Sequence, residues 1–207
     1  MGSAERRKRE AAETRQKILD AARDLFVQNG FDATSMRAIA ERIEYTPTAI
    51  YHHFQNKEAL LDELCGQDFR ELARAFQRIG EVADPVERIV RAGKAYVDFG
   101  LEHPQHYEFM FMTRRPTSHD ATNGPAKGDP GEDAYAFLRA AVAEAIEAGR
   151  FKDEYDDPDA VAQILWGSLH GQLSLRITKA EDPWVEFGEA RNTTDLVCKA
   201  LIHGMAK

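Results

Sequence analysis

The sequence predicts an all-α protein of about nine helices, in which three N-terminal helices precede a larger helical part. Apolar residues recur at helical spacing through most of the 207 residues, and no convincing alternation of apolar and polar residues marks a strand. Helix-capping side chains followed by proline, and glycines behind apolar runs, separate the segments. A hydrophobic fraction of 43% permits a substantial buried core, so we expect disorder only locally.

Two short helices joined by a tight connection are predicted between residues 34 and 54. In the first, Thr34 or Ser35 offers the capping oxygen, and the apolar residues at helical spacing are Met36, Ile39, Ala40 and Ile43. In the second, Thr46 can cap the helix and Pro47 fits its first position. We expect this second helix to run for about two turns.

The second of these helices has an apolar side and a polar side. Ile50 and Phe54 face inward, so the other side presents small or polar groups that can touch bases and phosphates in a major groove, namely Thr48, Ala49, Tyr51 and His52. This pattern favours a helix pair that reads DNA. The alternative is an ordinary three-helix core with a solvated polar face.

Asn56 is predicted to cap the following helix. Lys57 then lies in its first turn, where a cation is poorly placed for the helix dipole, so a phosphate from outside would explain it. The Tyr-His-His run also raises the question of a metal site. His52 and His53 are adjacent, however, and point about 100° apart on a helix, so we expect no metal there.

This segment resembles the N-terminal helix-turn-helix of the TetR family of bacterial transcriptional regulators. The matching residues are Thr34, Arg37, Ile39, Ala40, Thr46, Ile50, Tyr51, Phe54 and Lys57. Residues 14–31 look like the family's first helix with its glycine stop, whereas Glu44 and Thr48 depart from a pattern that often has glycine. We expect a DNA-binding domain over residues 13–59, in which Thr34, Thr46, Thr48, Tyr51 and Lys57 make turn and phosphate contacts and Arg37, Ala49 and His52 lie nearest the bases.

The charge is divided unevenly along the chain. Residues 1–60 hold ten of the 27 Lys and Arg residues and nine of the 35 Asp and Glu residues, so the formal net charge of −8 belongs to the later part. Residues 1–12 are expected to form a flexible basic arm that contacts phosphates or a minor groove through Arg6, Arg7, Lys8 and Arg9. The alternative is a solvated disordered tail.

Nothing in the sequence predicts a membrane span or a secretory signal, so we expect a cytoplasmic protein. Cys65 and Cys198 are too few and too far apart for a disulfide framework or a zinc site, and we expect both in the core. No cofactor or metal is expected. His103 and His106 could form a metal pair, but Pro104 places them at a helix start and no third ligand is evident.

The later part is predicted to be helical nearly throughout. A long helix follows residue 60, Asp84-Pro85 and Asp157-Pro158 each open another, and Pro104 marks a further start before the apolar run Tyr107–Met112. Glycine and proline make residues 114–131 a mobile loop, which we hypothesise gates a pocket. A helix over residues 132–148 ends at Gly149, and the last helix begins near Asn192 or Thr193.

Residues 166–171, with the sequence Trp-Gly-Ser-Leu-His-Gly, are similar to the pattern that names the Trp/His-Gly type of C-terminal domain in the same family. Residues 103–111 fit the preceding helix. The resemblance implies that residues 60–207 bind a small effector and form a homodimer through the last two helices. The expected pocket residues are Tyr96, Phe99, Phe109, Met110, Met112, Phe137, Trp166 and His170. The expected dimer interface contains Gly167, Leu169, Gly171, Leu173, Val197 and Leu201.

Alternatives remain for the pocket and for the function. The run Tyr107–Met112 suits a crowded core as well as a pocket wall, and His170 could be either a polar handle in that wall or a core histidine bonded to backbone. No phosphate loop, nucleophile elbow or His-Glu-x-x-His array indicates an enzyme. The sequence therefore predicts a regulator that binds a pseudo-palindromic operator and is released by an apolar or aromatic effector. A helical small-molecule-binding or adaptor protein without DNA activity is the alternative.

Overall fold

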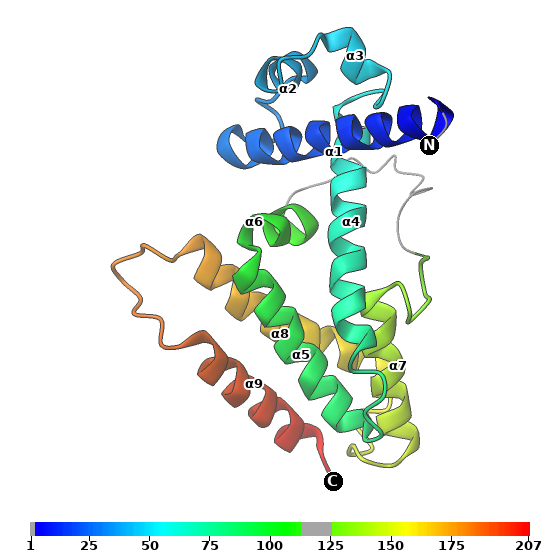
Figure 1. The fold of residues 1–207 in the computed structure, drawn as a ribbon. Helices are drawn as coiled ribbons and strands as arrows, with labels where there is room; N and C mark the ends of the chain where they lie inside the picture. Colours follow the sequence, from blue (N-terminus) through cyan, green and yellow to red (C-terminus); the bar gives the residue numbers. More distant parts are fainter. Residues whose placement is uncertain (1–2, 113–125) are drawn as a thin grey trace. The chain divides into compact units, whose positions relative to one another are not determined.

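The computed structural model describes residues 3–112 and 126–207, and these residues form an all-α fold (Figure 1). They contain no strand, only an isolated bridge between Phe151 and Ala206. The described residues divide into two compact units, one up to residue 67 and one from residue 68 onward. No helix among them is long and apolar enough to cross a membrane.

The first unit contains helices α1 (Ser3–Asn29), α2 (Met36–Arg42) and α3 (Pro47–Tyr51) and the first part of α4 (Lys57–Gln77). Residues 1–12 were expected to form a flexible arm, but helix α1 extends back through residues 3–12. Arg6 and Arg9 contact Glu10 and Glu13 one turn later, at 3.2 and 3.5 Å. Such pairs and the good helix formers around them stabilise an exposed helix.

The helix starts follow the capping residues that the sequence indicates. Ser35, rather than Thr34, caps α2 by accepting from Ala38 N at 3.1 Å. Thr46 caps α3 by accepting from Ala49 N at 3.3 Å, with Pro47 at the first position. Helix α3 is shorter than the two turns expected. Its apolar side is anchored by Ile50, which is fully buried, and Phe54 is buried just beyond its end.

Glu44 lies in the connection between α2 and α3 and has a positive φ of 59°. It is the only non-glycine residue with a positive φ among the described residues. A β-carbon is strained in this left-handed region, which glycine enters freely. Glu44 therefore keeps the turn that glycine would form, but its β-carbon makes this turn less stable.

The second unit contains the rest of α4 and five further helices, together with the π-helix η1 (Glu108–Met112). The five are α5 (Pro85–Glu102), α6 (Pro104–Tyr107), α7 (Ala134–Glu147), α8 (Pro158–Thr178) and α9 (Ala190–Met205). Asp84 and Asp157 cap α5 and α8 as predicted. Asp133 caps α7, which is followed by Gly149 with a φ of 66°. Helix α9 starts earlier than expected, because Glu189 caps it.

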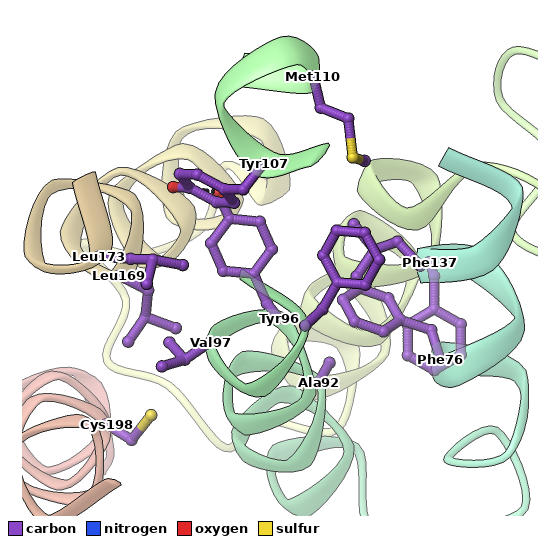
Figure 2. Packing of buried hydrophobic residues seen from close by; sticks show 12 residues of the cluster. Phe76, Ala92, Tyr96, Val97, Tyr107, Met110, Phe137, Leu169, Leu173 and Cys198 are labelled. Atoms are coloured by element: carbon purple, nitrogen blue, oxygen red, sulfur yellow. Dashed lines mark hydrogen bonds between the residues drawn. The ribbon is translucent and has the colours of Figure 1, made fainter. Parts of the chain in front are cut away.

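The core of the second unit is built around α5 (Figure 2). Leu169 of α8 lies so close to Gly93 that a β-carbon there would be 2.7 Å from its Cδ1. Leu173 packs in the same way against Gly100. Small residues on α5 thus let α8 approach closely. Leu169 and Leu173 are buried inside their own chain, which corrects their expected place in a dimer interface.

The predicted loop over residues 114–131 falls largely outside the described residues, up to residue 125. Its described end, from Ala126 to Gly131, contains turns and neither helix nor strand. Gly128 has a φ of 86°, which a glycine tolerates.

Candidate functional site

The outer side of α3 is the first candidate site. Thr48 and His52 are exposed, Ala49 is half-buried, and Tyr51 leaves 53% of its surface open to solvent. Because Ile50 is fully buried, it fixes the direction of the neighbouring side chains. The four predicted residues are therefore presented together on one side of a short helix.

Arg37 lies on the exposed side of α2. Its Nε donates to Glu41 Oε1 at 2.8 Å, one helical turn away, and this hydrogen bond raises the pKa of the guanidinium. Surface ion pairs of this kind are weak. An external phosphate or base could therefore compete for the guanidinium, which the first unit does not bury.

Thr34 and Lys57 are more engaged within the unit than the sequence suggests. The Thr34 hydroxyl is buried and donates to the carbonyls of Gly30, at 2.9 Å, and Leu25, at 3.1 Å. The Lys57 ammonium donates to the carbonyl of Phe31 at 2.6 Å and lies 4.2 Å from the centre of its ring. Thr34 thus joins α1 to α2 from inside, and carbonyl oxygens supply partners for the cation at the start of α4.

The four basic residues of the N-terminal segment all lie on exposed turns of α1. Arg6 and Arg9 pair with glutamates of the same helix. This arrangement places the charges on a helix rather than on an extended arm.

A cavity of about 340 Å³ lies in the second unit, between α4, α5, η1, α7, α8 and α9. Aliphatic and small side chains line most of it. Its aromatic lining residues are Phe69, Phe76, Tyr96, Phe111, Tyr135 and Trp166. A concave, mostly apolar space of this size is typical of small-molecule sites.

Polar groups beside the cavity are bonded to one another. Trp166 Nε1 donates to the hydroxyl of Tyr96 at 3.1 Å, and Tyr96 donates to the hydroxyl of Tyr107 at 2.9 Å. His170 Nδ1 lies 3.1 Å from the Tyr96 hydroxyl and also contacts that of Tyr107. Burial raises the pKa of Tyr96 to about 12 and lowers the pKa of His170. The network therefore holds neutral groups.

The cavity includes some of the predicted pocket residues and leaves out others. Tyr96, Met110 and Trp166 line it. Five residues that were predicted to line the pocket lie behind or outside its wall: Phe99, Phe109, Met112, Phe137 and His170. Phe137, for example, packs on Phe76 with ring centres 5.5 Å apart (Figure 2). His170 is bonded to side-chain hydroxyls, an arrangement that neither of the two sequence-based alternatives describes.

Two carboxylates at the edge of the cavity were missed. Glu132 and Asp133 line it just before α7. Both residues were predicted near a helix start, but a capping pattern gives no sign of what else the carboxylate faces. Only the packing of α7 against the other helices reveals this placement.

A second missed cluster brings His106 together with two acidic residues of α4. Donor atoms of Asp68, Glu71 and His106 lie within 4.8 Å of one another, with His106 Nδ1 3.0 Å from Asp68 Oδ1. His103 stacks on His106 with ring centres 5.0 Å apart. The sequence could not supply a third donor for the histidine pair, because the carboxylates come from a helix more than 30 residues away.

The outward side of α8 carries both glycines that were predicted at a dimer interface. Among the described residues, no atom beyond the nearby backbone of α8 itself lies within 4 Å of the positions where β-carbons of Gly167 and Gly171 would be. Leu175, one turn further on, leaves 54% of its surface exposed. Val197 and Leu201 of α9 are half-buried against the unit's own clusters.

Comparison with known proteins gives two family matches that together cover most of the chain. Residues 18–64 match the family described as "Bacterial regulatory proteins, tetR family". Residues 89–193 match the family described as "Tetracyclin repressor-like, C-terminal domain". The first match contains α2 and α3, and the second contains most of the cavity.

Relatives among characterised proteins are named as regulators of transcription. The HTH-type transcriptional regulator UidR of Escherichia coli strain K12 is 41% identical over 93 residues, which cover 45% of this chain and 42% of UidR. The chain thus matches less than half of UidR. The HTH-type transcriptional repressor Rv1474c of Mycobacterium tuberculosis is 27% identical over 176 residues, covering 83% of this chain and 86% of that protein.

Solved structures share the fold over nearly the whole chain. The fatty acid degradation regulator FadR from Bacillus halodurans has a TM-score of 0.72 at 17% identity, covering 92% of this chain and 95% of that one. Identity this low supports a common arrangement of helices and nothing about the ligand.

Proposed function

Because this chain belongs to the TetR family of bacterial regulatory proteins, we propose that it is a cytoplasmic, sequence-specific DNA-binding regulator of transcription whose DNA affinity responds to a small ligand. The observation that carries the proposal is the exposed side of α3, where Thr48, Tyr51 and His52 project from a helix anchored by buried Ile50. Repression, with release of the operator on ligand binding, is the expected mode.

We assign DNA contacts to residues 13–59. Helix α3 would enter the major groove, and Arg37 of α2, Ala49 and His52 would lie nearest the bases. Thr46, Thr48, Tyr51 and Lys57 would contact phosphates, as would the basic residues at the start of α1. Lys57 can donate to a phosphate while it keeps its hydrogen bonds to the carbonyls, since an ammonium has three donors. Thr34 drops out of the contact set because its hydroxyl is buried.

We assign ligand binding and dimerisation to residues 60–207. Two copies are needed to place two recognition helices in successive major grooves, about 34 Å apart, on a pseudo-palindromic operator. The outward side of α8, with Gly167, Gly171 and exposed Leu175, supports close approach of a second copy. The finer assignment to the Trp/His-Gly type is supported by Trp166 in the cavity wall and His170 behind it.

The cavity supports the ligand-responsive part of the proposal. A ligand there touches α5, η1, α7, α8 and α9 at once. By linkage it can release DNA only to the extent that it binds the relaxed conformer more tightly than the DNA-competent one. Its apolar lining favours an apolar or aromatic molecule.

Titration of a fluorescent DNA fragment from upstream of the protein's own gene tests the proposal. We expect saturable binding that resists nonspecific competitor and weakens steeply as salt rises. Tyr51→Ala should weaken this binding with unchanged thermal unfolding. The alternative, a small-molecule-binding or adaptor protein, predicts DNA binding no better than competitor together with ligand binding that barely responds to salt.

A further inference from the structure

We infer that the ligand of the cavity is a lipophilic organic cation, an assignment that rests on the proposed function only in taking this cavity as the regulatory site. Among the described residues that line the cavity, Glu132 and Asp133 are the only charged ones, and both are acidic. No lysine, arginine or histidine of the described residues faces the ligand space.

The hydrogen bonds that the structure gives these two carboxylates come from backbone N–H groups, which are neutral. Glu132 Oε2 accepts from Ala126 N at 3.0 Å. Asp133 accepts from Tyr135 N at 2.9 Å through Oδ1 and from Gly128 N at 3.0 Å through Oδ2. Backbone N–H groups orient a carboxylate but do not cancel its negative charge.

The same contacts prevent the start of α7 from serving an anion. A helix N-terminus usually attracts negative groups through its unpaired N–H donors and its dipole. Here Asp133 already accepts from the N–H groups of Tyr135 and Ala136. Lys127, close by in sequence, is exposed and does not line the cavity. Among the described residues, a carboxylate or phosphate ligand would thus meet two like charges and no basic partner.

The aromatic wall provides the second half of the argument. Trp166 lies between Phe111 and Tyr135, with ring centres 5.9 Å from each, and Phe111 also packs on Tyr96 at 5.5 Å. Aromatic faces attract cations, and most strongly where water is excluded. The Trp166 N–H donates to the Tyr96 hydroxyl, which itself donates to Tyr107, so the wall needs no polar ligand group. An apolar body with a positive charge toward Glu132 and Asp133 matches both features.

The test uses pairs of probes that share a shape and differ in charge. Tetraphenylphosphonium and tetraphenylborate are opposite ions of similar size, and phenyltrimethylammonium and tert-butylbenzene form a smaller cationic and neutral pair. Trp184 is 91% exposed in the connection between α8 and α9. Since the chain has two tryptophans, Trp184→Phe leaves Trp166 as the only indole, and its fluorescence reports binding in the cavity.

We expect each cation to bind at least about tenfold more tightly than its anionic or neutral counterpart. The double variant Glu132→Gln, Asp133→Asn keeps the hydrogen-bond acceptors and removes the charges. It should weaken cation binding roughly fivefold and strengthen borate binding, both effects shrinking with added salt. Glu189→Gln is the matched control, because Glu189 caps α9 in the same way but does not line the cavity.

Equal or tighter binding of the anion, a cation affinity unchanged in the double variant, or no response of Trp166 to any probe would overturn the inference. DNA titration of the same preparations without probes keeps the two proposals apart. Operator binding without cation binding would contradict only the proposed ligand class. Cation binding without operator binding would contradict the proposed regulatory function and support the proposed ligand class.

Discussion

Trp166 Nε1 donates a 3.1 Å hydrogen bond to the hydroxyl of Tyr96, which joins α8 to α5 beside the cavity. The same hydroxyl donates to Tyr107 and contacts His170 Nδ1. One oxygen thus bonds to Trp166, Tyr107 and His170 and holds this part of the wall in place. A buried network of this kind is stable only when every member is paired. Loss of one member should therefore lower the free energy of unfolding.

Tyr96→Phe should lower the free energy of unfolding by about 1–3 kcal/mol, because it leaves the Trp166 N–H without its partner and removes one of the two contacts of the Tyr107 hydroxyl. Urea unfolding followed by circular dichroism measures this. Tyr135→Phe is the control, since Tyr135 lines the same cavity and the described structure gives its hydroxyl no hydrogen bond. A loss of equal size in both variants would show that the network contributes nothing.

The pH dependence of stability should reflect the lowered pKa of His170. Burial lowers its pKa in the folded state, so the unfolded chain takes up a proton first as the pH falls. Stability is then complete above the unfolded pKa of about 6.5 and declines as the pH drops from there toward the lower folded pKa. His170→Gln should flatten this part of the profile, measured as urea midpoints between about pH 7.5 and 5.5. Parallel profiles would contradict it.

Glu44→Gly should stabilise the first unit by up to about 1 kcal/mol, because glycine adopts the observed φ of 59° without strain. Glu44→Ala keeps the β-carbon and removes the same charge, so it should give no such gain. Thermal unfolding of the three proteins compares them directly. If alanine matched glycine, the gain would come from the lost charge and not from the backbone.

The proposed dimer contact on the outward side of α8 makes Leu175 a sensitive position. Leu175→Glu should shift the protein toward a monomer by placing a charge on an apolar interface, with its circular dichroism spectrum unchanged. Sedimentation velocity at several concentrations measures the shift. Val185→Glu is the matched control, since Val185 is comparably exposed outside α8. A dimer that survives Leu175→Glu must use another surface.

The helix starts were predictable because capping is local. Thr46-Pro47, Asp84-Pro85 and Asp157-Pro158 each combine a capping side chain with a proline, and each begins a helix as expected. The inward side of α8 was not predictable in this way. That helix is apolar on nearly all sides, so periodicity could not reveal that Leu169 and Leu173 turn inward while Gly167 and Gly171 face out.

Long-range partners were equally hidden in the sequence. The carbonyl that binds Lys57 comes from a residue 26 positions earlier. Glu132 is predicted at the start of a helix and becomes part of a cavity wall only when α7 packs on the other helices. Both examples concern side chains whose role depends on tertiary contacts, whereas local rules describe only neighbours along the chain.

The most direct test of the central claim is selection of bound sequences from a pool of random duplex DNA, using the purified protein and its Tyr51→Ala variant. The account predicts enrichment of a pseudo-palindrome whose half-sites lie about one helical turn apart, or a multiple of it, and loss of that enrichment in the variant. Retention of DNA with no enriched sequence, or the same enrichment by both proteins, would contradict a reading role for α3.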